Sequence, residues 1–178
     1  FPRLGEIRDS RKLVEFYFTS TPSVCAIVYE QFPDINRLTY LDADLFFFSS
    51  PSTIFGEFKK DYSAAIIDHK YYGFGRRYQK YGRYNVGWIT FNNNRSGLAC
   101  LTEWQNNCLD WCFDRLENGK FADQKYLDYW PQKYPSTHII KNIGANVGPW
   151  NVGQYSISKQ DEYVCVDSNK IIFYHFAS

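Results

Sequence analysis

The sequence predicts one α/β domain, with a sheet flanked by helices and a C-terminal β-hairpin. Short apolar segments typical of buried strands alternate with helical patterns through the first two thirds of the 178 residues. Apolar residues make up 44 % of the chain and aromatic residues 20 %, a composition typical of a folded domain with a substantial core. Between Tyr163 and Phe176, two apolar runs flank Asp167-Ser168-Asn169, which is the pattern of a hairpin.

The elements can be placed in order from local signals. Strands are expected at 38–41, 45–48, 64–67 and 87–91, because these runs are short, apolar and bounded by turn residues. Helices are expected at 21–31, 52–58 and 96–118, and a further one from about residue 122. Thr21-Pro22 provides a helix start and Gly119 a helix stop, while Ser10 is a candidate cap for a short helix through Phe16. Residues 70–84 read as a basic, tyrosine-rich loop.

Charge and cysteine content narrow the function classes. Twenty Lys and Arg residues face 19 Asp and Glu residues, so the net charge of +1 gives no reason to expect nucleic-acid binding. No apolar run approaches the length of a membrane span, and the start of the chain lacks a signal-peptide pattern. The five cysteines have irregular spacing, which favours structural roles and a reducing compartment. We therefore expect a cytoplasmic protein, either free or at the inner face of the membrane.

Two aspartates, Asp42 and Asp44, interrupt the otherwise apolar stretch LTYLDADLFFFSS at 38–50. An ionised carboxylate between buried segments is costly unless something pairs with it. Side chains at i and i+2 share one face of a strand, so a bend after the strand would let both carboxylates meet one hard cation such as Mg²⁺ or Mn²⁺. Such a cation keeps coordination positions for phosphate oxygens, as a nucleotide-diphosphate site requires. The alternative is an exposed Asp-x-Asp turn.

Four segments carry a family resemblance. They are Tyr40-Leu41-Asp42-Ala43-Asp44, Asn85-Val86-Gly87, Asp123-Gln124, and Ile172-Phe173-Tyr174-His175-Phe176. In this order they resemble GT-A glycosyltransferases, closest to glycosyltransferase family 8 and its bacterial polysaccharide-synthesis relatives. The resemblance covers the chain from about residue 10 onward. It implies a GT-A fold with a mixed sheet, as a partial catalytic domain over residues 1–178.

The resemblance also implies an N-terminally incomplete domain. In the family, the strand and loop that hold the nucleotide base precede the region matched here. Family members also continue from the late histidine as H-x-x-G-x-x-K-P-W, whereas this sequence ends His175-Phe176-Ala177-Ser178. We therefore expect a fragment of a glycosyltransferase domain.

The resemblance implies roles at the metal and donor. Asp44 and His175 would bind a Mn²⁺ or Mg²⁺ ion, and Asp42 would bind the metal or the donor ribose. Asn85 and Gly87 would line the donor-sugar pocket, where a glycine allows close backbone approach.

Further residues are implied around the reacting sugar. Asp123 would hold sugar hydroxyls and Gln124 would lie near the anomeric carbon, making them the expected catalytic pair. Asp68 and His69, at a strand end, would meet the donor sugar or the acceptor, and Trp150 could stack on a sugar face. The implied reaction transfers a sugar from a nucleotide-sugar, with a UDP-sugar favoured, to a hydroxyl of a saccharide or lipid-linked acceptor. Retention of configuration and a role in bacterial surface-polysaccharide synthesis are expected.

Other interpretations stay open from the sequence. Single residues have structural explanations: a turn for Asn85, a helix N-cap for Asp123, and core packing for His175 and Trp150. A haloacid-dehalogenase-like phosphatase also places D-x-D after a buried strand, with the first aspartate as nucleophile and the second as general acid. A carbohydrate-binding domain without catalysis would use the same fold.

Overall fold

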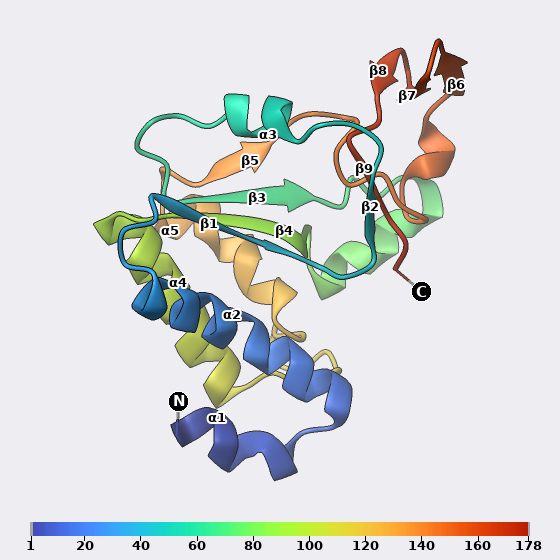
Figure 1. Cartoon of the computed structure of the whole chain (residues 1–178). Helices are drawn as coiled ribbons and strands as arrows, with labels where there is room; N and C mark the ends of the chain where they lie inside the picture. The colour runs from blue at the N-terminus through green and yellow to red at the C-terminus, as the bar shows by residue number, and fades with distance from the viewer. Residues whose placement is uncertain (1, 178) are drawn as a thin grey trace.

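The central sheet is formed by β1 (Arg37–Leu41), β3 (Ala64–Asp68), β4 (Tyr84–Asn92) and β5 (His138–Ile140) in the order β1-β4-β3-β5. A computed structural model describes residues 2–177 (Figure 1). β4 runs antiparallel to β1 and β3, whereas β5 is parallel to β3, so the predicted mixed sheet is present. β4 is buried almost throughout because it has a strand on each side and a layer on each face.

Two apolar cores lie on opposite faces of this sheet. On one face, α2 (Leu13–Gln31) and α4 (Arg95–Asp110) pack against each other and against the sheet, beneath it in Figure 1. On the other face, α3 (Ser52–Gly56) contributes to a second core that includes Trp88 and Phe173. Alternation along β3 supplies both cores, since Ile66 belongs to the first and Ile67 to the second.

The C-terminal part forms a hairpin and a separate strand. β7 (Tyr163–Val166) pairs with β6 (Ile157–Gln160) and with β8 (Asn169–Lys170), and the turn between β7 and β8 falls at the predicted position. The second predicted hairpin strand, however, is split. β9 (Phe173–His175) leaves the hairpin and pairs antiparallel with β2 (Leu45–Phe47). Pairing of β9 with β2 is favoured because it buries Phe173 fully and stacks its ring on that of Trp88, with ring centroids 5.6 Å apart.

The predicted start of α2 is wrong by eight residues. The helix begins at Leu13, and Pro22 lies inside it. At the real N-terminus, the Glu15 carboxylate accepts a hydrogen bond from the Lys12 backbone N–H at 2.8 Å, which provides a cap that the sequence reading overlooked. Packing against α4 offsets the backbone hydrogen bond that Pro22 cannot donate.

The predicted end of α4 is also wrong, because the helix stops at Asp110 rather than 118. Trp111 is extended, and the Tyr126 hydroxyl donates to the Asn107 and Trp111 carbonyls at 3.2 and 2.6 Å. These bonds satisfy carbonyls at the end of the helix. Gly119, with φ of 74°, turns the following loop instead.

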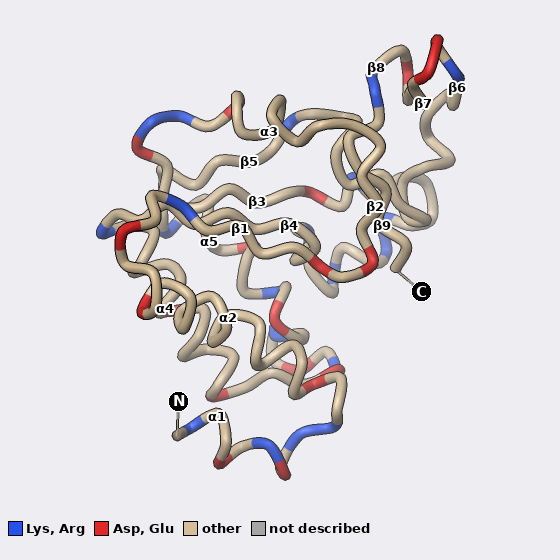
Figure 2. Tube along the Cα trace, in the orientation of Figure 1, with Lys and Arg blue, Asp and Glu red and all other residues tan. Residues whose placement is uncertain are grey.

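The remaining elements are short. They are α1 (Pro2–Ile7), η1 (Arg8–Ser10), η2 (Gly73–Tyr81), η3 (Gln124–Tyr129), α5 (Trp130–Lys133) and η4 (Val152–Gln154). η2 occupies the basic segment predicted as a loop, and η3 with α5 takes the place of the helix expected from about residue 122. Figure 2 shows Lys and Arg spread over several segments along with Asp and Glu. Within residues 2–177, none of the helices has both the length and the apolar character that crossing a bilayer requires.

Candidate metal and donor site

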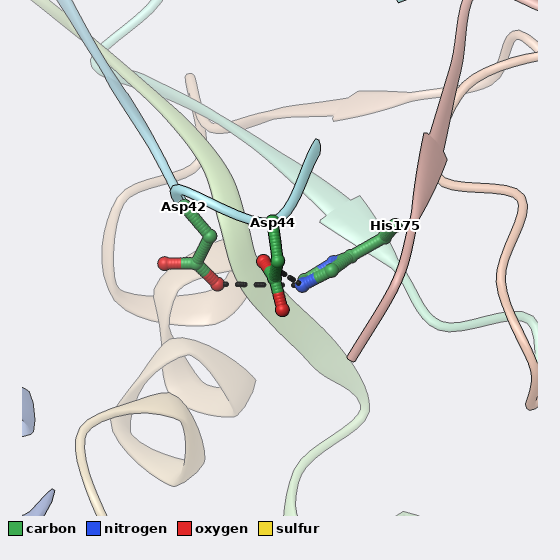
Figure 3. Close-up of side chains that lie close together, drawn as sticks. All are labelled: Asp42, Asp44 and His175. Atoms are coloured by element: carbon green, nitrogen blue, oxygen red, sulfur yellow. Dashed lines mark ion pairs between the residues drawn. The ribbon is translucent and has the colours of Figure 1, made fainter. Parts of the chain in front are cut away.

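Asp42, Asp44 and His175 converge at the junction between β1, β2 and β9 (Figure 3). His175 Nε2 lies 3.0 Å from Asp44 Oδ1 and 3.6 Å from Asp42 Oδ2. One oxygen of each carboxylate and one imidazole nitrogen all lie within 4.8 Å of one another. The structure therefore brings together the three residues predicted as metal ligands, from positions more than 130 residues apart.

Backbone hydrogen bonds hold this arrangement from three sides. The Asp42 N–H donates to the Gly87 carbonyl of β4 at 3.2 Å, and the Phe176 N–H donates to the Asp44 carbonyl at 2.9 Å. The His175 N–H donates to the Val147 carbonyl at 2.8 Å. Leu45, directly after the aspartate pair, is the partner of His175 in the β2–β9 ladder. The pairing of β9 with β2 thus places His175 beside the two carboxylates.

Gly87 is required beside the His175 ring. A β-carbon at this position would lie 2.6 Å from both Cε1 and Nδ1 of His175, and nearer still to Asn85 Oδ1. Such contacts are far inside ordinary van der Waals distance, so a side chain at position 87 would displace the ring. The close approach anticipated for Gly87 is therefore present, although its neighbour is a candidate metal ligand rather than an open sugar pocket.

Burial differs among the three candidate ligands. The His175 side chain is 3 % exposed, whereas those of Asp42 and Asp44 are 31 % and 46 % exposed. Burial raises the pKa of Asp42 above its ordinary value, and the nearby charge of Asp44 acts in the same direction. A hydrogen bond from the Tyr40 hydroxyl to Asp42 Oδ1, at 2.8 Å, opposes the increase in pKa. Two carboxylates held together in this way favour a cation between them.

A cavity of about 690 Å³ opens next to this cluster. The sequence-predicted residues that line it are Asp42, Asp44, Asn85, Asp123 and Gln124. Residues of α2, among them Tyr17 and Val24, form an apolar wall of the same cavity. Its size is within the range of small-molecule sites, and its walls combine carboxylate and amide groups with an aromatic surface.

Asp123 and Gln124 enter the cavity from the start of η3. Asp123 is 4 % exposed, and burial raises its pKa to about 8, with the charge of Asp42 adding to the increase. A carboxyl group in this state can donate a hydrogen bond as well as accept one. The Gln124 amide nitrogen donates to the Tyr81 carbonyl at 3.1 Å, which leaves its oxygen to accept a hydrogen bond from a ligand.

Asp68 and Trp150 occupy other positions. Asp68 pairs with Arg83 at 2.7 Å and accepts the Lys70 backbone N–H at 2.7 Å, and it is not among the residues lining the cavity. Trp150 stands edge-on to His175, with ring centroids 5.1 Å apart, and likewise does not line the cavity. In this structure Trp150 therefore packs against the His175 ring rather than against the cavity.

The donor set fits a hard divalent cation. Carboxylate oxygens with one imidazole nitrogen suit Mn²⁺ or Mg²⁺ better than a soft metal, which prefers thiolates. Among the described residues, all five cysteines are buried and unpaired, and none belongs to this cluster.

Comparison with known proteins places this geometry in context. No family model matches the chain. Two uncharacterized proteins of Bacillus subtilis (strain 168) are similar to it. YfnD is 30 % identical over 179 residues, which cover 99 % of this chain and 57 % of YfnD. YfnF is 36 % identical over 182 residues, which cover 98 % of this chain and 60 % of YfnF. The chain thus spans less than two thirds of the length of either relative.

A solved structure resembles the fold. It is a glycosyltransferase involved in the glycosylation of the major capsid of PBCV-1, with a TM-score of 0.59 and 12 % identity, covering 89 % of this chain and 68 % of that one. The likeness shows a glycosyltransferase-like fold. The finer resemblance to family 8, and the fragment interpretation, stay predictions.

Sequence reasoning overlooked Tyr40 and assigned His69 differently. Tyr40 hydrogen-bonds to Asp42 two residues later, a contact that the i, i+2 spacing on one strand face allows. His69, expected to meet the donor sugar or the acceptor, is 4 % exposed, does not line the cavity and contacts Asn85. Its position directly after a buried strand was the available signal, but its orientation depends on tertiary contacts.

Proposed function

We propose that this chain is part of a metal-dependent glycosyltransferase, which transfers a sugar from a nucleotide-sugar to an acceptor hydroxyl. The convergence of Asp42, Asp44 and His175 at the mouth of a cavity is the observation that carries this proposal. The likeness to a glycosyltransferase fold supports it and favours a transferase over the phosphatase alternative.

In this proposal the three ligands hold a Mn²⁺ or Mg²⁺ ion. When bound, such an ion offsets the negative charge on the diphosphate of the donor and of the leaving group. The chain's own residues then orient the donor. Asn85, Asp123 and Gln124 all line the cavity. Asn85 would offer an amide N–H, Asp123 would hold sugar hydroxyls, and Gln124 would lie near the reacting carbon.

The finer assignments follow the family resemblance. We propose a UDP-sugar donor, a saccharide or lipid-linked acceptor, and retention of anomeric configuration. The bacterial origin of YfnD and YfnF is consistent with surface-polysaccharide synthesis in the cytoplasm or at the inner face of the membrane. Asp68 and Trp150 would act on the donor indirectly, through Arg83 and His175.

Calorimetric titration of UDP and GDP, with and without Mn²⁺, tests the proposal. The chain should bind one nucleotide only with Mn²⁺, and Asp44→Ala should abolish that binding while leaving the fold intact by circular dichroism. Asp34→Ala is the matched control, since Asp34 is an exposed aspartate in a loop away from the cavity.

Other outcomes would point elsewhere. Saccharide binding independent of metal and nucleotide would favour a carbohydrate-binding domain, and phosphate release from an aryl phosphate would favour a phosphatase. If the chain binds no nucleotide, the titration is repeated on the full-length protein, and failure there would refute the proposal.

A further inference from the structure

A series of buried hydrogen bonds links the end of β3 to the aspartate pair. His69 Nδ1 lies 3.1 Å from the Arg83 carbonyl oxygen, and His69 Nε2 lies 2.9 Å from Asn85 Nδ2. Asn85 Oδ1 accepts the Gly87 N–H at 2.6 Å, and the Gly87 carbonyl accepts the Asp42 N–H at 3.2 Å. Of the residues in this series, Asn85 and Asp42 line the cavity.

Donors and acceptors can satisfy this series in only one direction. A carbonyl oxygen is an acceptor, so the Arg83 contact requires a proton on His69 Nδ1. In a neutral imidazole, Nε2 then carries a lone pair and accepts from the Asn85 amide nitrogen. With its nitrogen toward His69, Asn85 presents its oxygen to the Gly87 N–H. Rotating the amide by 180° would break both of these bonds at once.

The surroundings of His69 keep it in place and neutral. The residue is 4 % exposed, and its ring stacks on Tyr71 with centroids 4.5 Å apart and planes within 10°. The edge of Trp150 approaches from another side at 5.2 Å. Burial lowers the pKa of His69 to about 4, and the neighbouring Asp68 and Arg83 carbonyl only partly oppose this.

We propose that His69 is a positioning residue that sets the Asn85 amide so that the cavity receives an N–H donor. An amide nitrogen carries two hydrogens and His69 accepts one of them. No acceptor among residues 2–177 takes the second, and Asn85 lines the cavity. The group that this hydrogen recognises is an oxygen acceptor, such as a sugar hydroxyl or a phosphate oxygen. The recognition step rests on the proposed glycosyltransferase function, whereas the orientation of the amide does not.

Two substitutions of His69 distinguish the hydrogen-bond acceptor at Nε2 from the packing of the ring. In His69→Gln the side-chain amide reaches the position of Nε2 and can still accept from Asn85. In His69→Asn the shorter amide reaches only the position of Nδ1, so it keeps the contact to Arg83 and loses the one to Asn85. We expect His69→Asn to weaken Mn²⁺-dependent UDP-sugar binding about tenfold, and His69→Gln to restore most of that loss.

A double-mutant cycle and a spectroscopic readout complete the test. In an Asn85→Ala background, His69→Asn should cause no further loss of affinity and a smaller loss of unfolding midpoint than in the parent chain, because the hydrogen bond between the two residues is already absent and only the ring contacts of His69 remain to be lost. Long-range ¹H–¹⁵N spectra should show His69 as the neutral tautomer protonated at Nδ1. His138→Asn, at the far end of the sheet, assists the assignment and serves as the control for affinity.

Several results would overturn the inference. These are a His69 protonated at Nε2, equal affinity of His69→Asn and the parent chain, or additive effects of His69→Asn and Asn85→Ala on unfolding. If nucleotide binding is absent altogether, the tautomer and the unfolding cycle still decide the role of His69, so failure of the proposed function is distinguishable from failure of this inference.

Discussion

Substitution of Gly87 by alanine tests how tightly the candidate metal site is built. The added β-carbon would lie 2.6 Å from Cε1 and Nδ1 of His175, whereas ordinary contact begins at 3.4 Å. The ring or the strand must therefore move by about 0.8 Å, and the Asn85 side chain, whose Oδ1 would lie at 2.4 Å, must move as well. Both are restrained, because β4 is paired on each side and His175 is buried against Trp150.

The expected magnitude follows from metal–ligand geometry. Bond lengths at a metal tolerate changes of about 0.2 Å, so a displacement several times larger removes His175 as an effective ligand. We expect Gly87→Ala to weaken Mn²⁺ binding by about 10- to 100-fold, the range seen when the support of a ligand is lost. Overpacking should also lower the free energy of unfolding by about 1–3 kcal/mol.

Mn²⁺ titration calorimetry and urea unfolding measure these two effects. Gly56→Ala is the control, since a β-carbon there would meet nothing within 4 Å. The double substitution Gly87→Ala with His175→Ala should be less destabilised than the sum of the single changes, because removing the ring relieves the contact. A folded Gly87→Ala chain that binds Mn²⁺ as tightly as the parent would refute the reasoning.

Three further predictions concern buried groups. Burial raises the pKa of Asp123 to about 8, above its value of 3.8 in an unfolded chain. The free energy of unfolding therefore falls as pH rises between these two values. Asp123→Asn should be more stable than the parent chain at pH 8 but not at pH 4. Burial by itself raises the pKa of Glu15, but the backbone N–H groups of Lys12 and Asp114 outweigh it and the net pKa is lowered. The stabilisation from Glu15 is thus present above its ordinary pKa and is lost as pH falls through the lowered value, so Glu15→Gln should destabilise the chain by about 1 kcal/mol at pH 7 and less at pH 3 in urea titrations. Burial raises the pKa of Cys25 to about 12, so a thiol reagent at pH 8 should label it only as fast as the chain unfolds.

Each of these has a clear contrary result. A pH-independent effect of Asp123→Asn would show that its carboxyl group is not desolvated. An equal loss for Glu15→Gln at both pH values would show that packing, rather than charge, is what the carboxylate contributes. Labelling of Cys25 faster than unfolding would show that its thiol is accessible in the folded chain.

The sequence predicted those parts of the fold that depend on local patterns. The strand before Asp42 and the strand around Trp88 follow from short apolar runs bounded by turn residues. β4 extends further than predicted, from Tyr84 to Asn92. The placement of two carboxylates directly after a predicted strand likewise indicated a site at that position. That strand was expected to be buried, but β1 is only half-buried because it lies at the edge of the sheet. The prediction of an α/β sheet flanked by helices, which rests on such local patterns, is confirmed, and the mixed strand directions that the family resemblance implied are also present.

Helix ends and strand partners depended on contacts between distant segments. Pro22 is a start signal in isolation, but packing of α2 against α4 and a cap at Lys12 extend the helix past it. The pattern at 171–176 predicts a strand without specifying its partner, and pairing with β2 rather than β7 was decided by burial of Phe173 on the second core.

The sequence by itself determined that Asp42 and Asp44 lie together directly after a strand, where a turn brings both carboxylates to one place, because strand ends and turns are encoded locally. Only the tertiary structure decided that His175 meets them, since β9 must leave the hairpin and Gly87 must leave room for the imidazole ring. The tertiary structure also decided the role of His69, whose orientation toward Asn85 is set by the Arg83 carbonyl and a stacked tyrosine. Side-chain convergence of this kind arises from the packing of strands far apart in the chain, which no local pattern encodes.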